Sequence, residues 1–295
     1  MPRLRVCAIL QFSKMKIGIV GNGYVGGATA LLKSRNVDVL VYDVDDEKCR
    51  PRGTSMKDLL NCSFVFVCVP TPMDEEGKCF LSLVEEVVGK LTELGYEQQR
   101  IIIKSTVPVG TCRKLNVMFM PEFLTERNWK HDFLSQKNWI LGTNERSDRI
   151  RDDLYSIFDS AWHDGLLISR PHMTFSTTEE AELTKYVRNT FLATKVSFFN
   201  EMEEFCRINN ISYRKVRELT LYDDRIGDSH TSVPGPDGKR GFGGTCFPKD
   251  VSSLLHQVLD KGMVSYILNA ARNRNNDIDR REKDWEENKG RAVIE

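Results

Sequence analysis

The chain has 295 residues, enough for one large or two modest domains that each bury a hydrophobic core. Its 42 Lys and Arg residues balance 42 Asp and Glu residues, so no net charge favours a nucleic acid or an anionic membrane as a partner. The eight cysteines show no CxxC spacing, which favours reduced thiols in a cytoplasmic compartment over disulfides or a zinc site. No apolar run reaches the ~18 residues of a membrane span. The five His residues occur singly, without metal-ligand spacing.

Residues 1–14 are expected to be a disordered extension, with the fold beginning at Met15. Arg3 and Arg5 precede an apolar patch, Val6 to Leu10, that is too short for the core of a signal peptide. An amphipathic organelle-targeting segment is the alternative for this stretch.

From Met15 to residue 172 the pattern alternates between strands and helices. Lys16 to Val20 is a short apolar run followed at once by glycines, which predicts a buried parallel strand. Further strands are predicted at 37–42, 64–69, 101–105, 117–120, 139–141 and 166–169, with helices such as 83–94 and 148–158 between them. The alternation predicts an α/β fold, a doubly wound, mostly parallel Rossmann-type sheet.

After Pro171 the pattern becomes almost wholly helical, which predicts an all-helical central domain over 173–282 and a charged, frayed tail over 283–295. An unbroken helix over 179–209 would be roughly 45 Å long. Its apolar residues cover more than one face, which indicates burial against two partners. One or two further helices are predicted over 254–281.

A glycine-rich segment, Gly21-Asn22-Gly23-Tyr24-Val25-Gly26, directly follows the first strand and opens a helix. Asp43 stands at the end of the next strand, as in a dinucleotide-binding unit. Gly21 would allow the tight turn, Gly23 the approach of a pyrophosphate and Gly26 close packing of helix on strand. Asp43 would accept ribose hydroxyls and repel a 2′-phosphate, so the pattern favours NAD over NADP. A purely structural turn beside a surface Asp is the alternative.

A second glycine-rich segment, Gly241-Phe242-Gly243-Gly244-Thr245-Cys246-Phe247-Pro248-Lys249-Asp250, places a thiol before the first turn of a predicted helix. The positive end of the helix dipole favours the thiolate of Cys246, and Lys249 adds a cation nearby. These surroundings suit a covalent nucleophile; an unreactive, partly buried cysteine is the alternative.

Further polar residues are candidates to surround this thiol. Glu182, Lys185 and Asn189 fall on one face of the long predicted helix, where a solvent-facing or snorkelling lysine is the alternative reading of Lys185. The segments 104–108 and 121–126 follow predicted strands at the carboxyl edge of the sheet, where such folds bind ligands.

Together these motifs resemble those of the UDP-glucose 6-dehydrogenase family, within the wider UDP-glucose/GDP-mannose dehydrogenases. The matching segments, in the family's order, are Gly21–Gly26, Val69–Pro72, Ser105–Pro108, Pro121–Leu124, Glu182–Lys185 with Asn189, Asp224–Gly227 and Gly241–Asp250. They extend from Met15 to about residue 279.

The resemblance implies oxidation of the C6 alcohol of UDP-glucose to a carboxylate, with two hydride transfers to NAD in a homodimeric enzyme. It implies Cys246 as the thiol that adds to the aldehyde, Lys185 and Asn189 as oxyanion stabilisers, and Asp250 as the group that holds Lys185 and a water. It also implies Glu122 as the base for thioester hydrolysis and Thr106 as the residue that positions the water. The remaining implied contacts are Tyr24, Val25, Thr71 and Thr106 to NAD, and Glu126, Arg225 and Gly243 to the substrate. Arg225 would act across a dimer interface formed by the long helix.

Three departures from the family carry expectations of their own. The family has a second nucleotide-binding domain for the uridine diphosphate, which this sequence does not reach, so a catalytically impaired NAD-binding dimer, or a uridine site supplied by another chain, are alternatives. The short crossover after Val109 predicts local rearrangement of the sheet and displacement of Glu122. Met120 stands where the family commonly has Asn.

Overall fold

The computed structural model describes residues 14–144 and 148–294, which form two compact units. The first unit, here called the Rossmann unit, contains residues up to 69 together with 86–104 and 112–178. The second, the helical unit, contains 70–85, 105–111 and the residues from 179 onward. The predicted extension over 1–13 lies outside the described residues. Among the helices that are described, none is both long and apolar enough to cross a membrane.

A single sheet organises the described part of the Rossmann unit. Its strands, in chain order, are β1 (Met15–Val20), β2 (Val37–Tyr42), β3 (Phe64–Val67), β4 (Ile101–Ile103), β5 (Met118–Phe119), β6 (Asn138–Gly142) and β7 (His172–Ser176). They lie in the order β2-β1-β3-β4-β5-β6-β7. Neighbouring strands pair in parallel except β5 and β6, which are antiparallel. The prediction of a doubly wound, mostly parallel sheet is confirmed.

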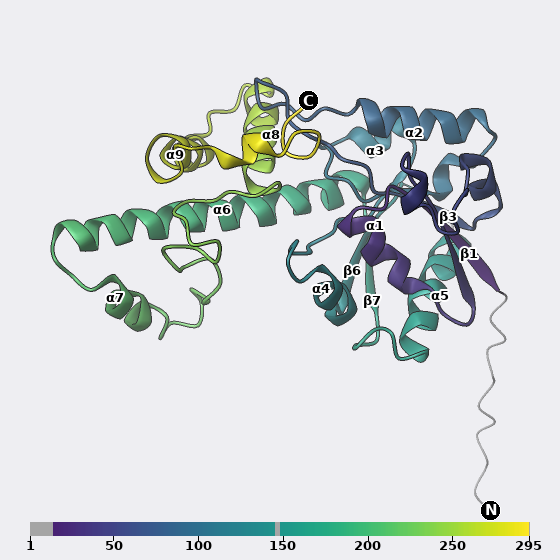
Figure 1. Cartoon of the computed structure of the whole chain (residues 1–295), viewed down its shortest axis with the longest axis horizontal. Coiled ribbons are helices and arrows are strands. Elements are labelled where there is room, and N and C mark those ends of the chain that lie inside the picture. The colour runs from purple at the N-terminus through teal and green to yellow at the C-terminus, as the bar shows by residue number, and fades with distance from the viewer. Residues whose placement is uncertain (1–13, 145–147, 295) are drawn as a thin grey trace, which may run out of the picture. The chain divides into compact units, whose positions relative to one another are not determined.

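Helices cover both faces of this sheet (Figure 1). Helices α1 (Tyr24–Thr29), α4 (Trp129–Ser135) and α5 (Asp148–His163) lie on one face, and α2 (Ser82–Glu93) and α3 (Thr111–Leu115) on the other. Short 3-10 turns occupy Ala30–Leu32, Asp46–Lys48, Met56–Asn61 and Gln98–Arg100. The central strands β3 and β4 are continuous apolar runs because both faces of the sheet are covered, and Ile17, Phe64 and Ile102 are completely buried.

Two sequence predictions about the sheet are wrong. No strand forms over 166–169; the last strand begins after Pro171, where Met173 and Phe175 alternate with polar residues, as suits a strand at the edge of a sheet. The sheet is also not rearranged after Val109, because α3 fits into the short crossover and β5 pairs in parallel with β4. The short crossover is accommodated by short elements, because α3 has 5 residues and β5 has 2.

The helical unit is built on α6 (Thr178–Ile208), a helix of 31 residues close to the predicted bounds. It is followed by α7 (Tyr213–Thr220), α8 (Phe247–Asp260) and α9 (Tyr266–Arg274). Helix α9 continues into a π-helical turn, η5 (Asn275–Asp279), and a 3-10 turn, η6 (Asp284–Glu287), follows. The sequence did not predict α7.

The expectation of a frayed tail is wrong for the residues up to Ile294. Trp285 and Ala292, which are 3% and 0% exposed, are buried against Met73. The Met73 N–H donates to the Ala292 carbonyl at 2.9 Å, and the Ile294 N–H donates to the Met73 carbonyl at 3.0 Å. The tail was expected to be frayed because most of its residues are charged, but its apolar residues Trp285 and Ala292 are buried within the helical unit.

Candidate active site

The turn between β1 and α1 has the backbone geometry that the glycine-rich segment predicts. Gly21 has φ +92°, and a Cβ there would meet the Cys68 carbonyl oxygen at 2.8 Å. A Cβ on Gly26 would meet the Gly21 carbonyl oxygen at 1.9 Å. A Cβ on Gly23 would meet nothing within 4 Å. The first two glycines are therefore required by the fold, whereas Gly23 leaves open space in which a ligand can approach the backbone.

Asp43 lies beside this turn at the end of β2. Its Oδ2 accepts a hydrogen bond from the Asn22 N–H at 2.7 Å, and its Oδ1 accepts one from the Asp45 N–H at 3.0 Å. An ionised carboxylate has about four acceptor positions, so both oxygens retain capacity for ribose hydroxyls. The open backbone at Gly23 and this oriented carboxylate fit a dinucleotide whose ribose carries no 2′-phosphate.

Within the helical unit, Cys246 is the N-cap residue of α8. Its carbonyl accepts the first helical hydrogen bond, from the Asp250 N–H at 2.9 Å, and Pro248 lies in the first turn. The Thr245 Oγ1 lies 3.8 Å from the Cys246 Sγ. The thiol thus lies at the N-terminus of a helix of 14 residues, where the positive end of the helix dipole is found.

Asp250, one helical turn beyond the thiol, joins two helices and is 1% exposed. Its Oδ2 accepts a hydrogen bond from the Asn189 Nδ2 of α6 at 2.6 Å, and its Oδ1 pairs with the Lys249 Nζ at 2.6 Å. Burial disfavours the charge on Lys249, but the acidic groups around it, first among them the Asp250 carboxylate, together raise the pKa of Lys249. The Lys249 ammonium is therefore held as an ion pair with Asp250, one helical turn from Cys246.

The predicted polar face of α6 is buried. Glu182, Lys185 and Asn189 are 0%, 3% and 7% exposed, so the solvent-facing alternative for Lys185 is excluded. The Glu182 Oε2 accepts a hydrogen bond from the Gly110 N–H at 2.6 Å. Because Asn189 on this face binds Asp250 of the cysteine helix, the buried polar face of α6 lies beside the helix that begins at Cys246 and is a candidate part of the site.

The other predicted residues divide between the units. Thr71 and Thr106 are buried in the helical unit, where the Cys79 thiol donates to the Thr106 carbonyl at 3.7 Å. Burial raises the pKa of Cys79 to about 11. The Arg225 side chain is 89% exposed and pairs with Asp223 at 2.6 Å. Its role toward a substrate stays a prediction.

Glu122 and Glu126 belong to the Rossmann unit, as do Tyr24 and Val25 at the start of α1. Glu122 is 6% exposed, and its Oε2 accepts a hydrogen bond from the Leu124 N–H at 2.7 Å. Glu126 is exposed. The roles of both carboxylates remain predictions.

Sequence reasoning missed two asparagines in the helical unit, Asn200 and Asn275, which bind the backbone of the cysteine segment. Asn200 is 11 residues after Asn189 on α6, close to three full turns, so it shares the polar face. The helical periodicity of α6 could therefore have identified Asn200. No sequence pattern could have identified Asn275, because its partner Phe242 is 33 residues away in the chain.

Comparison with known proteins identifies both units. Residues 50–159 match the NAD binding domain of the UDP-glucose/GDP-mannose dehydrogenase family, and residues 179–277 match its central domain. The UDP-glucose 6-dehydrogenases of Rickettsia bellii and Pseudomonas aeruginosa are each 30% identical to this chain, over 87% and 88% of its length. The chain spans 65% of the length of each of these relatives.

Solved structures agree at the level of the fold. A UDP-glucose dehydrogenase from Pyrobaculum islandicum is similar with a TM-score of 0.77 at 23% identity, over 90% of this chain and 69% of that protein. A GDP-mannose dehydrogenase from Pseudomonas aeruginosa has a TM-score of 0.63 at 25% identity, over 88% and 68% of the two chains. The Rossmann unit is an NAD-binding domain, and the chain belongs to the UDP-glucose/GDP-mannose dehydrogenase family.

Proposed function

We propose that this protein is an NAD-dependent dehydrogenase that oxidises a nucleotide sugar, UDP-glucose to UDP-glucuronate, through a covalent intermediate on Cys246. The observation that carries the proposal is the position of Cys246 at the N-terminus of α8, with the Asn189–Asp250–Lys249 cluster one turn away. The substrate follows from the relatives, several of which are named UDP-glucose 6-dehydrogenases.

The thiol answers a specific chemical need. Oxidation of the C6 alcohol gives up a hydride and a proton and leaves an aldehyde, whose remaining C–H hydrogen cannot leave as hydride until a nucleophile has added to the carbonyl carbon. Addition of the Cys246 sulfur to the aldehyde carbon forms a thiohemiacetal, whose loss of a second hydride gives a thioester. Water then attacks the thioester, releases the carboxylate and returns the proton to the thiol. Bound NAD supplies the hydride acceptor at each oxidation.

Each residue of the predicted set has a role in this scheme. Lys185 and Asn189 stabilise the oxyanion of the sulfur adduct, where positive charge and hydrogen-bond donors act most strongly because the site is buried. Asp250 binds Asn189 and Lys249. By resemblance to the family it would also hold Lys185 and a water. Glu122 is the base that activates the hydrolytic water, which Thr106 positions.

The proposed enzyme is a homodimer formed through α6. Leu183, Val187, Phe191, Phe198 and Phe205 are 42–65% exposed and recur at spacings of four and seven residues, so they form one apolar stripe along the helix. A second copy of the same stripe would cover it in an isologous contact, across which Arg225 would reach the substrate. Glu126 and Gly243 are the other proposed substrate contacts. Sedimentation should show a dimer that Phe191→Asp converts to monomer.

A second candidate is an NAD-binding dimer that does not turn over. It is motivated by coverage, because the aligned part is 65% of the length of each enzyme relative. The nucleotide part of a sugar nucleotide contributes much of the binding energy of such a substrate. Calorimetry separates the two. NAD affinity without affinity for any sugar nucleotide would favour this candidate, whereas tight binding of UDP-glucose would argue against it.

The decisive experiment is a turnover assay of the purified chain with NAD and a panel of UDP- and GDP-sugars. We expect NADH formation with UDP-glucose, two NADH per sugar, and loss of acid formation in Cys246→Ser. Cys206→Ser is the matched control, since it removes a buried thiol of the same helical unit that has no part in the scheme. Absence of NADH with every sugar would refute the enzymatic proposal.

A further inference from the structure

Buried asparagines grip the backbone of the segment that leads to Cys246. The Asn275 Oδ1 accepts a hydrogen bond from the Phe242 N–H at 2.7 Å, and its Nδ2 donates to the Phe242 carbonyl at 3.0 Å. The Asn200 Oδ1 accepts one from the Gly241 N–H at 3.1 Å. Asn275 and Asn200 are 0% and 2% exposed. Both backbone polar groups of Phe242 are thus bound by a single side chain.

The π-helical turn explains how one short segment provides so many contacts. Its closing hydrogen bond runs from the Arg280 N–H to the Asn275 carbonyl at 2.7 Å, five residues back. The wider turn brings Asn275, Asp279 and Arg280 against the same stretch of backbone, since a Cβ on Gly241 would meet the first two and a Cβ on Gly243 would meet the Arg280 guanidinium. Such turns are rare and concentrate at functional sites.

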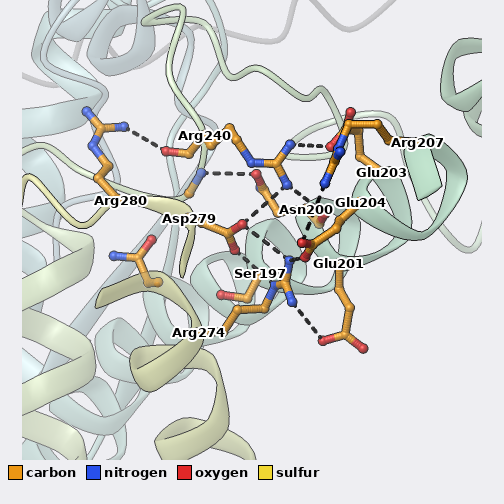
Figure 2. A network of polar contacts seen from close by, with 12 residues as sticks. Ser197, Asn200, Glu201, Glu203, Glu204, Arg207, Arg240, Arg274, Asp279 and Arg280 are labelled. Carbon is orange, nitrogen blue, oxygen red and sulfur yellow. Dashed lines mark hydrogen bonds and ion pairs between the residues drawn. The ribbon is translucent and has the colours of Figure 1, made fainter. Parts of the chain in front are cut away.

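An ionic frame fixes this turn in place, and Figure 2 shows Arg240 and Arg274 converging on Asp279. The Asp279 side chain is completely buried; burial raises its pKa, against the opposing effect of the two arginines. Arg274 also pairs with Glu204 of α6 at 2.8 Å, and Arg240 pairs with Glu203. The turn is therefore tied to α6, the helix that carries Lys185 and Asn189.

Phe242, whose backbone Asn275 binds, also packs against α8, the helix that begins after Cys246. Phe242 forms a hydrophobic cluster with Ala193 of α6 and Val251 of α8. Its backbone is held by Asn275, and its ring contacts both the helix that begins after Cys246 and the helix that bears the polar face. Holding Phe242 consequently fixes the sulfur relative to the groups around it.

We propose that Asn275 is a positioning residue for the Cys246 nucleophile, acting through the backbone of Phe242. The inference rests on the proposed function for its catalytic meaning, but the placement of the thiol can be measured without turnover. Displacement of a reacting group by about 1 Å can lower the rate about 100-fold. Loss of the two hydrogen bonds from Asn275 should therefore lower the rate of the reactions of Cys246 and leave cofactor affinity unchanged.

The test compares three variants of the full chain. Asn275→Ala removes both hydrogen bonds. Asn275→Asp keeps the shape and the acceptor for the Phe242 N–H but, when ionised, cannot donate to the carbonyl. Asn273→Ala is the matched control, an exposed asparagine two residues earlier, in α9. Iodoacetamide labelling of Cys246, followed by mass spectrometry of its peptide, gives an alkylation rate constant for each, beside kcat, KM, NAD affinity and Tm.

We expect Asn275→Ala to lower kcat and the Cys246 alkylation rate by about 10- to 100-fold, with NAD affinity unchanged. Asn275→Asp should be intermediate, with a smaller defect relative to wild type at low pH, where the protonated acid can donate. A fall in Tm alone, with kcat and alkylation of folded protein unchanged in either variant, would overturn the proposal. If wild type labels at Cys246 but never forms NADH, the proposed function fails while the positioning role is still tested by alkylation.

Discussion

The two glycine-rich loops of this protein need their glycines for different reasons. In the Rossmann unit, a Cβ on Gly26 would lie 1.9 Å from a backbone oxygen of the same loop. In the helical unit, a Cβ on Gly243 would lie 2.5 Å from the guanidinium of Arg280. At Gly26 the backbone of the loop itself excludes a side chain, whereas at Gly243 side chains from a distant part of the chain do so.

This difference determines how each loop can change. A backbone clash can be relieved only by moving the loop and the strand that carries it. A side-chain clash can be relieved by shortening the side chain, so Gly243 can tolerate a paired substitution that Gly26 cannot. Gly26 is thus required by local backbone geometry, and Gly243 by a tertiary contact.

The largest effect is expected for Gly26→Ala. The added methyl overlaps the Gly21 oxygen, so we expect a loss of about 3 kcal/mol in the free energy of unfolding, the upper part of the range for overpacking, and no detectable NAD binding. Gly23→Ala is the control, since its φ of −74° suits any residue and its Cβ would meet nothing. It should keep wild-type stability while weakening NAD. Urea unfolding and calorimetry measure both, and a Gly26→Ala protein of normal stability would refute the backbone argument.

Gly243→Ala should cost less and should be rescued. We expect a loss of about 1–3 kcal/mol from the contact with Arg280, which is 3% exposed and held by Asp237 and Asp284. In the Arg280→Ala background the same substitution should cost at least about 1 kcal/mol less, a coupling that a double-mutant cycle measures by urea unfolding. Equal costs in both backgrounds would show that the backbone, as in the Rossmann loop, is what excludes the methyl.

The same contrast explains how far the sequence could predict this molecule. The strands, α6 and the first glycine loop are local patterns of hydrophobicity and turn residues, and they were found. The edge strand after Pro171 was missed because its alternation of polar and apolar residues is weak evidence in so short a run. The role of Asn275 could not be predicted, because this residue of a helical segment binds the loop only through Phe242, which is 33 residues away in the chain.

Asp43→Asn should have an intermediate effect confined to the Rossmann loop. The neutral amide accepts hydrogen bonds more weakly than the carboxylate that holds the Asn22 N–H, and ribose hydroxyls lose a charged partner. We expect about 1.5 kcal/mol less NAD binding energy, roughly a tenfold rise in Kd, with discrimination against NADP reduced. Titration of both nucleotides checks this, and an unchanged preference for NAD would contradict the role of Asp43.

The smallest effect is expected from acid, and it tests the ionic contacts behind the Gly243 loop. The Arg280 guanidinium donates to both Asp284 oxygens at 2.8 Å, which lowers the pKa of Asp284 to about 2 from an ordinary 3.8. A depressed carboxylate pKa contributes stability that is complete above the ordinary value and is lost as pH falls toward 2. Because Asp284 is 22% exposed and its other partner Lys239 is more exposed still, solvent screening limits the contribution to about 1 kcal/mol at most.

Asp284→Asn should therefore flatten the decline in unfolding free energy between pH 4 and pH 2, measured by urea titration at each pH, while changing little at pH 7 beyond the loss of the pair itself. Asp277→Asn is the control, because that exposed carboxylate lies in the π-helical turn three residues before Arg280. If the control flattens the curve equally, the acid sensitivity reflects general charge rather than the bidentate pair. If only Asp284→Asn does so, the side chain that crowds Gly243 is held by its own counter-ion, and the nucleophile loop depends on charge in a way that the nucleotide-binding turn does not.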